Sequence, residues 1–195
     1  LRGAAQQFAH KGKHMIISKI EHAAMLTTAK ELEKQGFEFT YLGVDKYGMI
    51  DLEELKKAIR PDTIFIGVMF ANNEVGTIQP IKEVAQIAKE HGILCFTDAV
   101  QAMGTLKTDV RELGVDLMSF SAHKFYGPKG IGALYVRNGV PIGRIITGGH
   151  QERTKRGGTT NVPAIVGFAE ALSIAEEELD KNAKYIASLR DAFIE

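Results

Sequence analysis

Short apolar runs rich in β-branched residues alternate with amphipathic segments along most of the chain, and this alternation constrains the fold more than any other feature. The runs predict strands at residues 15–18, 37–43, 63–70, 93–97, 117–121 and 133–136. The amphipathic segments predict helices at 23–35, 52–59 and 81–91, and one long helix from about residue 163 to the end. Strand–helix–strand alternation is typical of a mostly parallel sheet with helices on both faces. We therefore expect an α/β fold of the doubly wound type.

A glycine-rich stretch marks the best candidate for a domain boundary. Residues 148–162 include Gly148, Gly149, Gly157 and Gly158. This polar, glycine-rich composition suits a loop that contacts a ligand or a partner. We expect a sheet domain over residues 1–147, and over residues 163–195 a helix that leads into a smaller C-terminal domain. The chain starts without methionine and stops inside an amphipathic pattern, so we expect both ends to be cuts through a longer polypeptide.

The charges of the chain balance, with 24 basic and 24 acidic residues. No overall field would then favour nucleic acid or an anionic membrane as a partner. The longest apolar stretches, such as residues 63–71, are too short to span a bilayer, and no N-terminal signal pattern is present. A single cysteine excludes an internal disulfide and fits a reducing compartment, so we expect a cytoplasmic protein.

Polar residues follow three of the predicted strands at the point where each strand ends. Asn72, Asn73 and Glu74 follow one strand, Asp98 follows another, and the segment 121–124 follows a third. In open sheets of this kind, ligands bind at the carboxyl ends of the strands. The sequence therefore predicts a functional site at this edge of the sheet.

Lys124 is the strongest candidate for covalent chemistry. It lies in the run Ser-Ala-His-Lys-Phe-Tyr-Gly-Pro-Lys-Gly, between a predicted strand and a glycine-rich turn. A lysine in such a place is most often a solvated surface residue. Here, however, the side chains of Ser121 and His123 can donate to a phosphate, and burial beside such a cluster would favour the neutral amine that Schiff-base formation requires.

Asp98 ends an apolar run and therefore needs a partner for its carboxylate. That partner could be a helix N-terminus, a cationic side chain, or the ring nitrogen of pyridoxal 5′-phosphate (PLP). A carboxylate on the ring nitrogen keeps it protonated, so that the ring withdraws electrons from a substrate joined to the aldehyde. Lys124 and Asp98 together predict a PLP site.

Three further residues lie near these two in the expected fold. Gln101 can donate to the phenolic oxygen of the cofactor or remain a surface residue. His22, where a strand gives way to a helix, can stack on the ring and move protons, or can be an ordinary residue at a helix N-terminus. Asn73 can bind the cofactor or a substrate carboxylate, or can simply form a turn.

Other motifs point away from competing chemistry. Cys95 lies inside a predicted strand, an odd number of residues from Asp98, so its side chain should face away from the site and pack in the core. The glycines of residues 127–132 lack the Gly-Lys-Ser/Thr of a P-loop and the third glycine of a dinucleotide fingerprint. The six histidines show no paired ligand spacing, so we expect no metal site.

With these residues in hand, the chain resembles the cysteine desulfurases, in the class V aminotransferase group of fold-type I PLP enzymes. The resemblance runs over almost the whole chain, and its matching stretches are residues 18–22, 69–76, 97–102, 118–135, 148–153 and 156–159. The Glu-His, Asn-Asn-Glu and Gln-Glu-Arg motifs place it in the iron–sulfur-assembly branch. His150 stands where the family usually has glycine, which puts the backbone conformation expected from the family in doubt at this position.

The resemblance implies a role for each candidate. Lys124 would carry the cofactor, Asp98 would hold its ring nitrogen and His22 would stack on the ring. The cofactor ring substituents would be held by Asn73 and Gln101, and its phosphate by Ser121 and His123. Thr159 would reach across a homodimer interface to the phosphate of the neighbouring subunit. Residues 1–147 would form the PLP-binding large domain without its first part, and 148–162 a cofactor and dimer loop.

The implied activity is removal of sulfur from L-cysteine, giving L-alanine and an enzyme persulfide for an iron–sulfur scaffold or another sulfur acceptor. In the family, the cysteine that forms the persulfide lies beyond the segment that this chain matches. Two alternatives remain. One is another class V enzyme, an aminotransferase or a selenocysteine lyase. The other is a catalytically inactive module that serves dimerisation or partner binding.

Overall fold

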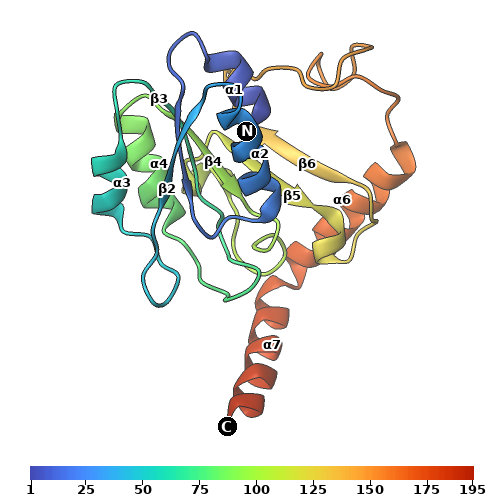
Figure 1. Cartoon of the computed structure of the whole chain (residues 1–195). Coiled ribbons are helices and arrows are strands. Elements are labelled where there is room, and N and C mark those ends of the chain that lie inside the picture. Colours follow the sequence, from blue (N-terminus) through green and yellow to red (C-terminus); the bar gives the residue numbers. More distant parts are fainter.

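The computed structural model describes all 195 residues and contains one six-stranded sheet in the order β2-β1-β3-β4-β5-β6 (Figure 1). The strands are β1 (His14–Ser18), β2 (Glu38–Leu42), β3 (Thr63–Gly67), β4 (Leu94–Asp98), β5 (Leu117–Ser121) and β6 (Gly132–Val136). All neighbouring strands are parallel except β5 and β6, which are antiparallel. The expected mostly parallel α/β sheet is confirmed.

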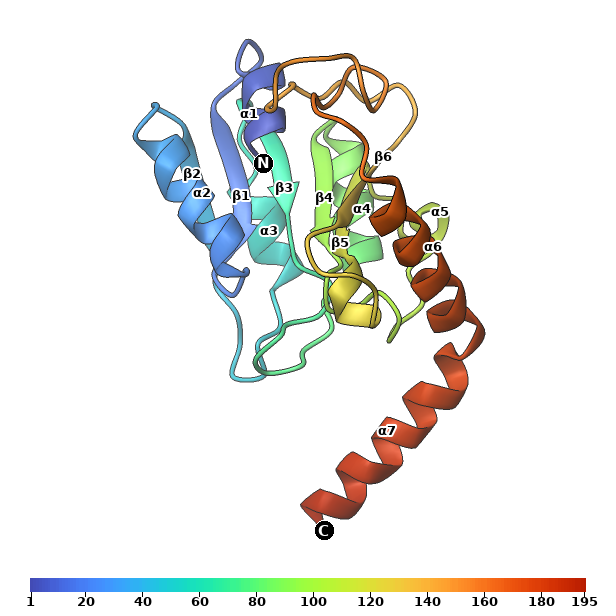
Figure 2. The same ribbon diagram turned by 90° about the vertical axis from the view of Figure 1, so that its right-hand side faces the viewer.

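The helices cover both faces of this sheet (Figure 2). They are α1 (Arg2–Phe8), α2 (Ala23–Glu33), α3 (Leu52–Ala58), α4 (Ile81–Glu90), α5 (Val110–Leu113), the 3-10 helix η1 (Ala122–Phe125), α6 (Val162–Glu177) and α7 (Leu179–Ile194). Side chains of α1 and α2 share one hydrophobic cluster with the sheet, and those of α3, α4, α5 and α6 share another on the opposite face. The doubly wound arrangement follows from these two layers.

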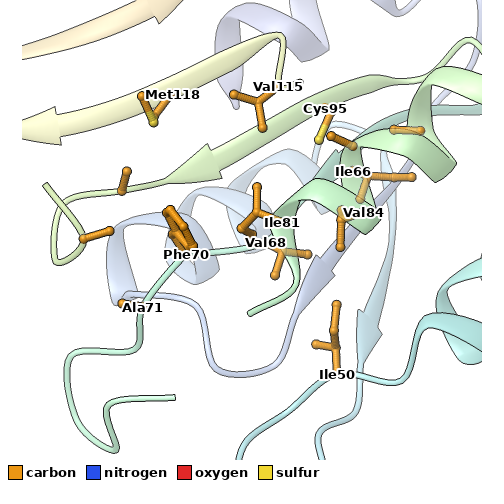
Figure 3. Close-up of a cluster of buried hydrophobic side chains, with 14 of the residues drawn as sticks. Ile50, Ile66, Val68, Phe70, Ala71, Ile81, Val84, Cys95, Val115 and Met118 are labelled. Carbon is orange, nitrogen blue, oxygen red and sulfur yellow. The ribbon is translucent and has the colours of Figure 1, made fainter. Parts of the chain in front are cut away.

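The core explains why the central strands are buried at every position. Every residue of β1 and β3 is buried, because each of these strands has helices on both of its faces. Figure 3 shows the larger cluster, in which Ile66, Val68 and Phe70 pack with Ile81 and Val84 of α4. In β1, Ile16 belongs to this cluster, whereas Met15 and Ile17 belong to the cluster on the opposite face.

Strand β3 is shorter than the apolar run from which it was predicted. The predicted strand covers 63–70, whereas β3 stops at Gly67. The backbone nevertheless continues alongside β4, since the N–H groups of Val68 and Phe70 donate to the backbone carbonyls of Phe96 and Asp98. Residues 68–70 therefore remain extended as they approach the sheet edge.

The predicted single C-terminal helix is wrong. The structure has two helices, α6 and α7, which meet at Glu178 (φ −96°, ψ 2°). Helix α6 packs against η1, whereas α7 buries none of its residues and extends away from the sheet (Figures 1 and 2). The Glu178 carboxylate accepts hydrogen bonds from Lys181 and Asn182 in the first turn of α7. These contacts lie within the first turn of α7, and no buried residue of α7 packs against the sheet domain.

Helix α1 is a second departure, since no helix is predicted before residue 14. Its buried residues are Gly3, Ala4 and Ala5, which are too small to produce an amphipathic stripe in the sequence. None of the helices in the structure combines the length and the hydropathy that a bilayer-spanning segment needs.

Candidate functional site

The carboxyl ends of four adjacent strands bring most of the predicted residues to one edge of the sheet. His22 follows β1, Asn73 follows β3, Asp98 ends β4, and residues 121–124 follow β5. Strand order places these ends side by side as β1, β3, β4 and β5. In register, Asp98 lies opposite Ser119, two residues before the end of β5. Adjacent strands are about 5 Å apart, and so Asp98 is near the start of the Lys124 segment.

Lys124 lies on η1, the turn that directly follows β5. The hydroxyl of Ser121 and Nδ1 of His123 are 2.9 Å apart, so these two predicted phosphate ligands do lie together. Tyr126 ends η1 in the left-handed conformation (φ 67°), and its N–H donates to the carbonyl of Ala122. The expected burial of Lys124 is wrong for this chain, because its side chain is exposed. None of the 195 residues covers the edge at that point.

Asp98 is half-buried, and its two carboxylate oxygens have different surroundings. Oδ1 accepts the N–H of Val100 at 3.0 Å, which stabilises the turn after β4. No α-helix starts there, and Asp98 forms no ion pair, so two of its three predicted partners are not found. Gln101 lies in the same turn and is half-buried. Oδ2 of Asp98 is left for a ligand.

His22 is the N-cap of α2 and is exposed. Its Nδ1 accepts the N–H of Ala24 at 3.2 Å. Because Nδ1 accepts a hydrogen bond, the ring proton of the neutral side chain lies on Nε2. The alternative role at a helix N-terminus is therefore observed, and it leaves the Nε2–H as a donor at the sheet edge.

Two residues that hold this edge together were named in the sequence motifs but were given no role by the sequence predictions. Asn72 is buried; its Oδ1 accepts the N–H groups of Glu74 and Val75, and its Nδ2 donates to the carbonyl of Ile20 at 2.9 Å. Its neighbour Asn73 is exposed.

Glu21 is the second, with a side chain that is only 4% exposed. Both residues are polar and directly adjoin predicted site residues, which is the one signal in the sequence that could have found them. Neighbouring polar residues give no sign of which one is buried.

Thr159 lies apart from the other candidates. The segment 143–161, orange in Figures 1 and 2, runs at the opposite end of the sheet from η1, the short yellow helix. Its start is fixed to α1 by a hydrogen bond from the N–H of Gly143 to the carbonyl of Gly3. Thr159 is exposed, and the segment that carries it lies away from the edge at which Lys124 and Asp98 lie.

The same segment contains a left-handed turn. Glu152, Arg153 and Thr154 all have positive φ (50°, 54° and 69°), which is strained for residues with a Cβ. His150 is not among the positive-φ residues. The backbone there is thus open to any residue, and histidine in place of glycine does not distort it.

Cys95 is confirmed as a core residue. It is 2% exposed, and burial, with the charge of Asp116, raises the pKa of its thiol to about 12. A thiol of this kind does not act as a nucleophile at neutral pH. No group of three or more His, Cys, Asp or Glu side chains has the arrangement to hold a metal ion.

Two surface cavities lie away from this edge. One of about 550 Å³ lies between α1, α2 and residues 144–147, and one of about 480 Å³ between α6 and residues 103–111. At the edge itself, the side chains of Lys124, His22 and Asn73 are exposed. Its donor set is a primary amine, a half-buried carboxylate with one free oxygen, and a hydroxyl–imidazole pair. Such a set fits a ligand that carries a carbonyl, a basic ring nitrogen and an anionic group.

Comparison with known proteins gives consistent matches. The family model described as aminotransferase class-V matches residues 1–195. The chain is 54% identical over 194 residues to a protein named cysteine desulfurase IscS from Dictyoglomus turgidum. The matched region covers 100% of this chain and 49% of that protein. The chain spans about half the length of the curated relatives it matches.

Solved structures agree with the sequence match. A NifS-like protein superimposes with a TM-score of 0.96 at 47% identity, over 99% of this chain and 53% of that one. A structure described as SspA in complex with cysteine has a TM-score of 0.84 at 43% identity, over 88% of this chain and 50% of that one.

Proposed function

The chain belongs to the aminotransferase class-V family, and on that premise we propose that it provides the cofactor site of a PLP-dependent cysteine desulfurase. One observation carries the proposal: the Lys124 amine and the Asp98 carboxylate lie at the ends of adjacent parallel strands, at the edge where such sheets bind ligands. The curated relatives that match the whole chain bear this activity in their names.

The donor set at this edge fits PLP, which supplies an electron sink for a deprotonated amino acid when bound. Lys124 would anchor the cofactor and, once released, would take the Cα proton of the substrate. Oδ2 of Asp98 would hold the ring nitrogen, since Oδ1 is occupied by the N–H of Val100. His22 would face the ring with its Nε2–H, because its Nδ1 is occupied at the helix N-terminus.

The remaining candidates would hold the periphery of the cofactor. Ser121 and His123, already in contact with each other, would bind its phosphate. Asn73 and Gln101 would bind the ring substituents. The segment 143–161, which carries Thr159, runs at the opposite end of the sheet from η1, so Thr159 would act in the site of a second subunit of a homodimer.

The proposed substrate is L-cysteine, in agreement with the bound cysteine in the description of one structural neighbour. In the reaction the C–S bond breaks, the sulfur passes to a thiolate, and L-alanine leaves. Cys95 cannot be that thiolate, since it is buried with a pKa of about 12. The sulfur must pass to a thiol outside these 195 residues, and then to an iron–sulfur scaffold or another acceptor. A cytoplasmic location would keep such thiols reduced.

Trapping the cofactor tests the site directly. The purified protein is mixed with PLP, reduced with borohydride and digested, and mass spectrometry should find the adduct on Lys124. Lys124→Ala should remove both the adduct and the absorbance of the bound cofactor. Lys129→Ala, which changes an exposed lysine five residues further on, should retain both. A covalent adduct that persists in Lys124→Ala would refute the assignment.

The substrate is tested separately on the protein that carries the adduct. Release of L-alanine from L-cysteine, with persulfide on a thiol, is the expected outcome. If the adduct forms but only selenocysteine or an amino acid–keto acid pair reacts, the protein is another class V enzyme. If no adduct forms, the inactive interaction module is the better interpretation.

A further inference from the structure

The carboxyl group of Glu21 is buried at the centre of the sheet edge and is only partly satisfied. Its Oε1 accepts two hydrogen bonds, from the hydroxyl of Ser18 at 2.6 Å and from the N–H of Met69 at 2.7 Å. Its Oε2 is buried with no hydrogen-bond partner. A buried carboxylate without a counter-charge is unfavourable, so the neutral acid is the stable form below about pH 7. Since Oε1 is occupied by two donors, the proton lies on Oε2.

Glu21 connects two strands at the point where the strand order reverses. Ser18 ends β1, and Met69 lies two residues beyond β3, 48 positions from Glu21 in the sequence. Asn72 makes a second tie across the same gap, to the carbonyl of Ile20. The connection that carries His22 is thus attached to the end of β3 by two side chains.

We propose that Glu21 is a positioning residue for His22: its buried carboxyl group fixes the β1–α2 connection against β3, and, because this group ionises more readily when exposed than when buried, opening of the connection becomes easier as the pH rises. Loosening the connection disturbs the N-cap of α2 and, with it, the direction of the His22 Nε2–H. The significance of His22 for catalysis rests on the proposed function. The structural role of Glu21 does not.

The surroundings of the carboxyl group agree with this role. Burial raises the pKa of Glu21 to about 7; the hydrogen bonds from Ser18 and Met69 oppose this, and the charge of Asp98 adds to it. Asp98, on β4, is the charged group of a neighbouring strand that acts on it. The titratable residues of its own connection are Lys19 and His22, which are exposed, and neither Ser18 nor the Met69 amide titrates in this range.

Amide hydrogen exchange of Met69 in the purified protein, without added cofactor, tests the proposal. The protection factor should fall about tenfold between pH 6 and pH 8, the ratio expected when a carboxyl group has a pKa of about 7 when folded and about 4.5 when exposed. Glu21→Gln, which keeps the shape and cannot ionise, should remove this fall. Glu74→Gln, a change to an exposed carboxylate at the same edge, should leave it as in the wild type.

The orientation of His22 gives a second readout. Its imidazole ¹⁵N shifts at pH 7.5 should report the Nε2–H tautomer in Glu21→Gln and a mixture of tautomers in Glu21→Ala. Equal protection factors and equal His22 tautomers in the wild type and the Gln variant across pH 6–8 would overturn the proposal, whether or not the Ala variant folds. Loss of the Lys124 adduct would refute the proposed function and leave these measurements unaffected.

Discussion

Gly127 packs between η1, which carries Lys124, and α6. A single methyl group at Gly127 should therefore disturb both helices. A Cβ at Gly127 would lie 2.9 Å from Cβ of Ala122 on η1, 3.0 Å from the Ala122 carbonyl oxygen and 3.2 Å from Cβ of Ala171 on α6. None of these atoms is the end of a flexible side chain. In Gly127→Ala, η1 or α6 must therefore shift.

The size of this effect follows from two opposing contributions. Inserting a methyl group into a well-packed site destabilises a protein by about 1–3 kcal/mol. Replacing glycine by alanine also restricts the unfolded chain, which stabilises by about 0.4–1 kcal/mol. Gly43→Ala is the matched control, because the nearest atom to its added Cβ is Oε2 of Glu54, at 3.8 Å, an ordinary contact. Neither glycine has positive φ, so the difference between the two variants isolates the steric cost.

Urea and thermal unfolding of the two variants measure that difference. We expect Gly127→Ala to be less stable than Gly43→Ala by about 1–3 kcal/mol, or about 2–12 °C in Tm for a chain of this size. Borohydride trapping at Lys124 should also be weaker in Gly127→Ala, since η1 carries the lysine. Equal stability of the two variants would show that η1 and α6 do not pack as the structure has them.

Two further predictions concern buried groups away from the sheet edge. Burial, with the charge of Arg60, lowers the pKa of His14, which is hydrogen-bonded to Thr63 and Thr40. The unfolded chain then takes up a proton below about pH 6.5 that the folded chain does not, so His14 destabilises the fold as the pH falls. Urea titrations should show a smaller loss of unfolding free energy at low pH in His14→Gln than in the wild type. An identical dependence of the unfolding free energy on pH in both proteins would contradict this. Cys95 should resist a thiol reagent at pH 8 until the protein is unfolded, because its thiol is buried and protonated; rapid labelling of the native protein would show that β4 opens readily.

Several features of the fold could be predicted because they depend on local patterns. The apolar runs of the central strands are visible because both faces of the sheet are covered there. The third predicted helix begins at Ile81, after Pro80, and ends at Glu90, before Gly92 with φ 66°, as its flanking residues indicate. These signals lie within a few residues of the element that they define.

Other features depend on partners that the local sequence does not reveal. The apolar run of β6 carries no sign of its antiparallel direction, which is set by its pairing with β5. The break at Glu178 involves neither proline nor glycine, so the local sequence carries no signal for it. The exposure of Lys124 also depends on what covers the edge, which its neighbours in sequence cannot show.

The amino-acid sequence alone determined the class of fold and the edge at which its reactive side chains gather, because strand direction and chain order bring the residues after successive parallel strands to one side. Only the tertiary structure decided which of those side chains are buried and what each of them binds. Glu21 and His22 are adjacent in sequence. Glu21 is buried and accepts a hydrogen bond from a backbone amide 48 residues away, whereas His22 is exposed and caps a helix. Burial and hydrogen bonding set the proton affinity of a side chain, and both come from residues that are distant in sequence.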